Sequence, residues 1–158
     1  MKFSTKTLVT ASLLVAIAIV LQNVAITTSF FRFSFFEFPL ILLGFLFGPV
    51  MGLIAGFVTD FIYVMINPWA FSFNLMTIST MMIGFIAGIS FIKTRKPKNT
   101  YVFGTVVLIG LVTFILNTVQ LYLWKGNAIW ADFPLRLIIM IIKWPIYTYL
   151  FTKIKVFK

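Results

Sequence analysis

The chain has 158 residues, of which 61% are hydrophobic and 10% charged, and its mean hydropathy is +1.09. Soluble domains carry roughly 25% charged residues, so this composition excludes a soluble enzyme and predicts a core that is solvated by lipid. The formal charge of +10 is gathered at the edges of apolar stretches, and this excludes the continuous basic face of a nucleic-acid-binding protein.

Six apolar stretches predict an all-α polytopic membrane protein with six transmembrane helices in one compact domain. We expect these helices at residues 5–26, 35–47, 50–66, 74–92, 101–124 and 133–152. A span needs about 20 apolar residues to cross ~30 Å of hydrocarbon, so the second stretch is short. The first stretch follows lysines, as in a signal peptide, but it has no clear cleavage site and we expect it to be retained.

Basic residues form three clusters, and their positions predict the orientation of the bundle. The clusters are Lys2 and Lys6; Lys93, Arg95, Lys96 and Lys98; and Lys153, Lys155 and Lys158. With six spans all three clusters fall on one side, and short cytoplasmic loops are rich in Lys and Arg. The sequence therefore predicts a multi-pass protein of a cell membrane with cytoplasmic N- and C-termini.

Two cations interrupt the last apolar stretch, where a charge is costly. They are Arg136 and Lys143, and an ionisable group inside a membrane helix indicates a functional site. A guanidinium can bind a carboxylate with two parallel hydrogen bonds, so we expect Arg136 to hold an anionic ligand. The alternatives are that Arg136 reaches the outer headgroups or pairs with Asp132, one turn earlier. Lys143 could reach Asp60, line the pocket or face a partner subunit.

Three blocks of sequence resemble a known family of membrane proteins. The first is FPLILLGFLFGPVMG at 38–52, followed by Gly56 and Asp60; the second is FNLMTIS at 73–79, followed by Gly84 and Gly88. The third is FPLRLI at 133–138, with a proline and an isoleucine at 145 and 146. Together they are similar to the S-components, the substrate-binding membrane subunits of energy-coupling factor (ECF) vitamin transporters, and to their folate branch in particular.

The resemblance implies a six-helix subunit that binds a vitamin from outside the cell with high affinity. Such a subunit docks on a transmembrane coupling subunit that carries two ATPases. The small-residue docking motif of the family's first helix corresponds here to Ser12-x-x-x-Ala16, with Ser in place of Ala. The alternative is that Ser12 and Ala16 only pack against helices of the same chain, as small residues do in any helix pair.

The resemblance and the polar residues together predict a ligand pocket at the outer end of the bundle. We expect Asp60, Asn74, Asn117 and Gln120 to read a heterocycle by hydrogen bonds, or to link helices. The aromatic loops at 27–34 and 67–73 are expected to close over the ligand. The pocket candidates on these loops are Arg32, Phe33, Trp69 and Phe73. Glu37, on the helix predicted at 35–47, is a further candidate. An acid at Glu37 departs from the folate branch and is closer to riboflavin-type members.

The sequence carries no enzyme motif, so we expect no catalysis by this chain. It has no P-loop and no Gly-x-Ser-x-Gly, and it contains neither Cys nor His, so we expect no metal and no cofactor. Folate is the predicted ligand, followed by pantothenate, then riboflavin or a pyrimidine- or pyridoxine-type vitamin. The prediction from a different class is a small helical channel or scaffold that binds no vitamin.

Overall fold

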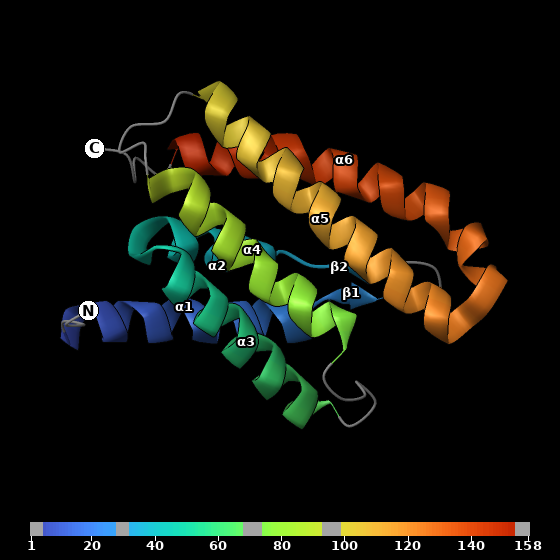
Figure 1. The fold of residues 1–158 in the computed structure, drawn as a ribbon, viewed down its shortest axis with the longest axis horizontal. Helices are drawn as coiled ribbons and strands as arrows, with labels where there is room; N and C mark the ends of the chain where they lie inside the picture. The colour runs from blue at the N-terminus through green and yellow to red at the C-terminus, as the bar shows by residue number, and fades with distance from the viewer. Residues whose placement is uncertain (1–4, 28–31, 68–73, 93–98, 154–158) are drawn as a thin grey trace.

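The computed structural model of the chain describes residues 5–27, 32–67, 74–92 and 99–153. These residues form six α-helices, one short 3₁₀-helix and a hairpin of two very short strands (Figure 1). In chain order the elements are α1 (Thr5–Asn23), β1 (Ile26–Thr27), β2 (Arg32–Phe33), α2 (Glu37–Phe47), α3 (Pro49–Ile66), α4 (Leu75–Ile92), α5 (Asn99–Lys125), η1 (Gly126–Ala128) and α6 (Ile129–Lys153).

Several helices are long and apolar enough to cross a membrane. Among the described residues these are α1, α3 and the continuous stretch Asn99–Lys153, which holds α5, η1 and α6. The helix α2 has 11 residues, or about 16 Å at 1.5 Å per residue, which is half the thickness of the hydrocarbon core. The helical membrane fold is confirmed, whereas the count of six spans stays a prediction.

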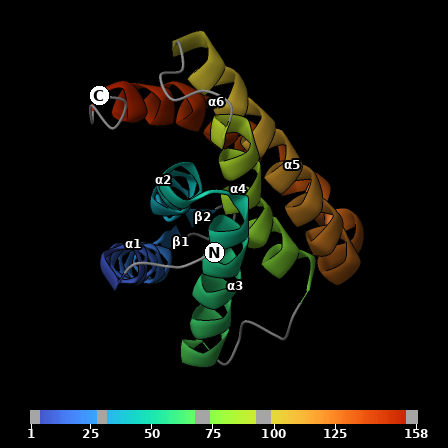
Figure 2. The ribbon, with the colours of Figure 1, turned by 60° about the vertical axis from the view of Figure 1, so that its left-hand side comes forward.

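The helix α4 lies at the centre of the bundle. It contacts α2 and α3 on one side and α5 on the other, and α6 packs along α5 (Figure 2). The start of α1 and the end of α6 lie at the same end of the molecule (Figure 1). The side of the membrane to which this end belongs remains a prediction.

Glycines let α3 and α4 approach each other closely. A Cβ on Gly52 would collide with the backbone of Gly84, and a Cβ on Gly56 would lie 2.7 Å from the Cα of Met81. In lipid, association of helices depends on such close packing, because there is no hydrophobic driving force between them. Gly52 and Gly56 are four residues apart, so both lie on the face of α3 that meets α4.

The first helix is shorter than predicted. It ends at Asn23 rather than at residue 26, because Ile26 and Thr27 pair in antiparallel register with Phe33 and Arg32. The two ends of the segment predicted as a loop therefore pair with each other as short strands. The second helix also begins later than predicted, at Glu37.

The connection between α5 and α6 is helical rather than an open loop. Gly126 has φ +58°, in the left-handed region where glycine commonly ends a helix, and η1 leads directly into α6 at Ile129. The last helix was predicted to start at residue 133. Asp132, expected in the loop, lies in the first turn of α6.

The outward faces of the helices are apolar. Large side chains such as Leu13 and Val20 on α1, Ile115 on α5 and Ile138 on α6 are exposed. Asp60, Thr77 and Ser79 are buried instead. A lipid environment requires this arrangement, in which polar groups lie inside the bundle and apolar groups lie outside.

Candidate functional site

A cavity of about 420 Å³ lies inside the bundle, and every α-helix contributes to its wall. Its apolar lining includes Ile83, Ile109, Phe114, Ile139 and Met140. Its polar lining is Gln22, Ser34, Glu37, Asp60, Tyr63, Ser79, Thr80, Thr113, Asn117, Lys125, Asp132, Arg136, Lys143 and Tyr147. A concave, mostly apolar site with a few convergent polar groups has the character of a small-molecule pocket.

Arg136 lines the cavity from α6 and forms no ion pair with the described residues. Its Nη1 is buried without a hydrogen-bond acceptor, and the guanidinium carbon lies 5.6 Å from the centre of the Phe114 ring. Asp132, the alternative partner, instead forms an ion pair of 3.5 Å with Lys125. A half-buried cation with a buried, unsatisfied donor is costly, so this position is suited to an anion.

Asp60 lines the same cavity from α3, and its carboxylate is almost fully buried. Its Oδ2 accepts a hydrogen bond of 2.6 Å from the hydroxyl of Thr77 on α4. It forms no ion pair with Lys143 or Arg136. A carboxylate that has only a neutral donor can accept further hydrogen bonds from a ligand.

Lys143 has a partner that the sequence did not reveal. Its ammonium nitrogen lies 2.9 and 3.1 Å from the two carboxylate oxygens of Glu37 on α2. The hydroxyl of Tyr147, one turn further along α6, donates to Glu37 Oε2 at 2.6 Å. Of the alternatives for Lys143, an ion pair with Asp60 does not form, whereas Lys143 does line the cavity. We refer to Glu37, Lys143 and Tyr147 as the inner cluster.

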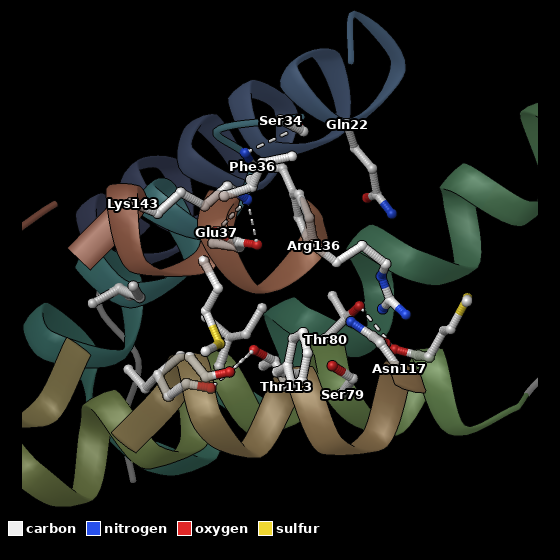
Figure 3. A pocket seen from close by; sticks show the side chains of 18 of the residues that line it. Gln22, Ser34, Phe36, Glu37, Ser79, Thr80, Thr113, Asn117, Arg136 and Lys143 are labelled. Carbon is white, nitrogen blue, oxygen red and sulfur yellow. Dashed lines mark hydrogen bonds and ion pairs between the residues drawn. The ribbon is translucent and has the colours of Figure 1, made fainter. Parts of the chain in front are cut away.

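The inner cluster and Arg136 occupy different parts of the cavity. Figure 3 shows Glu37 and Lys143 to one side and the guanidinium of Arg136, with Asn117, to the other. Lys143 follows Arg136 by seven residues on α6, which is two helical turns. The cavity thus extends along α6, with Arg136 closer to the α5–α6 connection.

The three amides predicted for the site are separated by the structure. Asn117 lines the cavity. Gln120, three residues later, accepts a hydrogen bond of 3.1 Å from the backbone N–H of Leu75 at the start of α4. Asn74 caps the same helix, since its Oδ1 accepts a bond of 2.8 Å from the N–H of Met76. Of the three, only Asn117 lines the cavity.

The aromatic candidates are only partly described. Phe33 packs edge-on against Phe35, with ring centres 4.9 Å apart, and Lys143 Nζ lies 5.5 Å from the centre of the Phe33 ring. Arg32 is described only by its backbone, in β2. Trp69 and Phe73 lie outside the described residues.

Sequence reasoning missed several polar residues of the wall, among them Ser79, Thr80, Thr113 and Tyr147. Helical spacing could have found two of them, because Thr113 precedes Asn117 by four residues and Tyr147 follows Lys143 by four. Ser79 and Thr80 carry no such signal. Hydroxyls are common inside membrane helices, where they also bond to their own backbone.

Ser12 and Ala16 lie on the outer surface of α1. Both are exposed, and the hydroxyl of Ser12 donates to the carbonyl of Leu8 at 2.8 Å. The small residues that pack against the rest of the chain are Ala11 and Ala18, which are buried. The alternative that Ser12 and Ala16 serve packing within the chain is therefore wrong.

An apolar helical bundle with an internal cavity lined by polar groups defines a membrane-embedded protein that binds a small molecule. Comparison with known proteins is more specific. The chain belongs to the family described as "ECF transporter, substrate-specific component", whose model matches residues 6–157. It is thus a multi-pass membrane protein and a substrate-binding subunit of a transporter.

Individual relatives were found by sequence and by structure. The folate transporter FolT of Clostridium novyi (strain NT) is 28% identical over 123 residues, which are 78% of this chain and 72% of that protein. A crystal structure of FolT bound with folic acid has a TM-score of 0.82 and 28% identity, over 94% of this chain and 91% of that one. A structure of the S component of a bacterial ECF transporter matches with a TM-score of 0.66 and 22% identity, over 94% and 95% of the two chains.

Proposed function

We propose that this chain is the folate-binding subunit of an ECF-type importer. The observation that carries the proposal is the charge pattern of the cavity. Among the described residues, the cavity has one guanidinium, Arg136, and one carboxylate, Asp60, that form no ion pair. Folate has carboxylates at one end and a heterocycle rich in N–H donors at the other, so it could satisfy both groups.

The roles of the site residues follow from this match. Arg136 binds a glutamyl carboxylate, and Asp60 accepts hydrogen bonds from the aminopyrimidine edge of the pterin. Asn117 contributes further hydrogen bonds from α5. The similarity to a FolT structure that contains folic acid supports this ligand over pantothenate, riboflavin and the pyrimidine- or pyridoxine-type vitamins.

The proposed transport cycle requires partners and a fixed orientation. The subunit takes folate from outside and docks on a transmembrane coupling subunit with two ATPases, which supply ATP hydrolysis. Docking uses the outward face of α1 around Ser12 and Ala16. The six helices cross the membrane with both termini in the cytoplasm, a topology supported by the shared end of α1 and α6 (Figure 1).

The replacement of Arg136 by alanine tests the proposal. Calorimetry of the detergent-purified full chain with folic acid should show saturable binding. Arg136→Ala should weaken it by about 2–5 kcal/mol, because the ligand carboxylate would be buried without its partner. A control is Lys125→Ala, which removes a half-exposed cation from the rim and should have a much smaller effect. Equal affinities of wild type and Arg136→Ala would contradict the assigned role.

A further inference from the structure

The inner cluster is a charged group that the proposed clamp by Arg136 and Asp60 leaves unused. Glu37, Lys143 and Tyr147 all line the cavity, and they join α2 to α6. The side chains of Lys143 and Glu37 are 13% and 21% exposed, so both charges are largely removed from solvent. A pair of this kind that only held helices together would not need to face the cavity.

The two charges of the inner cluster cancel each other. The ammonium of Lys143 contacts both oxygens of Glu37, so this end of the cavity has no net charge. Arg136, in contrast, forms no ion pair with the described residues, and its Nη1 has no hydrogen-bond acceptor. An anion is therefore attracted to Arg136, whereas at the inner cluster it would meet the carboxylate of Glu37 as well as the ammonium.

The inner cluster still has hydrogen-bonding capacity for a ligand. An ammonium has three N–H donors, and the bonds from Lys143 to Glu37 account for two of them. A carboxylate has about four acceptor sites, and Lys143 and Tyr147 occupy three of those on Glu37. The cluster can thus offer one donor beside one acceptor. This arrangement complements a neutral ring edge of a ligand on which an acceptor lies beside a donor.

The spacing along α6 separates the two ends of the cavity. Seven residues separate Arg136 from Lys143, or about 10 Å at 1.5 Å per residue. The wall between them is lined by Ile139 and Met140. The fitting ligand is anionic at one end, apolar in the middle and neutral but hydrogen-bonding at the other end.

We propose that Glu37, Lys143 and Tyr147 form a specificity-determining subsite for the neutral heterocyclic end of the ligand. This inference rests on the proposed function, in which the ligand is folate and Arg136 holds its carboxylates. The O4 and N3–H groups of the pterin then lie against the inner cluster, while its 2-amino group donates to Asp60 on α3. Glu37 has the particular role of neutralising Lys143, so that this end selects a neutral ring over a second anion.

Two ligands that differ only in the heterocycle separate this subsite from the rest of the cavity. They are folic acid and N-(4-aminobenzoyl)-L-glutamate, which has the same carboxylates and benzene ring but no pterin. The variant is Glu37→Leu combined with Lys143→Met in the full-length purified chain. Replacing both members of a buried ion pair by apolar residues of similar size is often neutral for stability, so this variant is expected to fold.

The double variant should bind folic acid about 10- to 100-fold more weakly, since it loses charge-assisted hydrogen bonds to the heterocycle. Its affinity for the truncated ligand should stay within about twofold of wild type, because that ligand does not reach the inner cluster. Glu37→Gln keeps the shape of the side chain. It should also weaken the binding of folic acid while leaving the affinity for the truncated ligand nearly unchanged. Arg136→Ala should weaken both ligands, since both carry the carboxylates.

A matched control is Lys125→Met combined with Asp132→Leu, which removes the ion pair at the other end of the cavity. It should leave the ratio of the two affinities unchanged. An equal loss for both ligands in the inner-cluster variants, or no loss for either, would overturn the subsite while leaving folate binding intact. Failure of the wild type to bind folic acid would overturn the proposed function and the subsite together.

Discussion

At the scale of single residues, the described polar groups of the cavity divide into those already paired and those that are not. Lys143 and Glu37 are paired, as are Lys125 and Asp132, whereas Arg136 forms no ion pair. Pairing is what makes a charge tolerable in a membrane helix. A charge left without an ion-pair partner in the protein is therefore the best indication of where a ligand binds.

Asp60 provides a test at this scale. Asp60→Asn keeps the hydrogen bond from Thr77 but removes the charge, and it should weaken folic acid by about 1.5–3 kcal/mol because hydrogen bonds to a charged acceptor are the stronger kind. Calorimetric titration measures the change. The control is Thr59→Val, a buried neighbour whose hydroxyl bonds to the carbonyl of Ala55. Equal effects of the two variants would indicate that Asp60 acts on the fold rather than on the ligand.

At the scale of elements, composition was sufficient to predict six helices but not their ends or their pairing. The hairpin of β1 and β2 was missed, because its segment has no alternating pattern and only two residues in each strand. The ion pair between Glu37 and Lys143 joins residues 106 apart in sequence, and no local signal connects them. The spacing of Gly52 and Gly56 is typical of a close helix contact, but nothing in it indicates that α4 is the partner.

That contact predicts a difference between two glycine substitutions. Gly84→Ala should lower the free energy of unfolding by about 1–3 kcal/mol, because the added methyl would collide with the backbone of Gly52, which cannot rotate away. Gly104→Ala on α5 meets nothing within 4 Å and should be neutral or stabilising by up to about 1 kcal/mol. Thermal unfolding in detergent compares them. Equal melting temperatures would show that α3 and α4 can separate without cost.

At the scale of the whole molecule, the proposed surfaces for ligand binding and partner docking are different. The cavity lies between the helices, while Ser12 and Ala16 face outward from α1. Small residues on an outward face leave room for a partner helix to approach closely. The two activities should therefore be separable by mutation.

Ala16→Leu should abolish or strongly reduce co-purification with the coupling subunit and its ATPases, because the larger side chain prevents close helix contact. Its affinity for folic acid should equal that of wild type. Gly104→Leu is a matched control, since it adds the same side chain to an exposed position on α5. Normal assembly of the Ala16→Leu protein would place the docking surface elsewhere.

The measurement that tests the central claim most directly is ligand stabilisation of the purified wild-type chain by a panel of B vitamins. Stabilisation grows as RT ln(1 + [L]/Kd), so a ligand at 100 times its Kd adds about 2.7 kcal/mol. Folic acid should raise the melting temperature saturably, and pantothenate, riboflavin and pyridoxine should not. Stabilisation by one of these vitamins in place of folic acid would contradict the folate assignment. No shift with any vitamin would contradict a vitamin-binding function altogether.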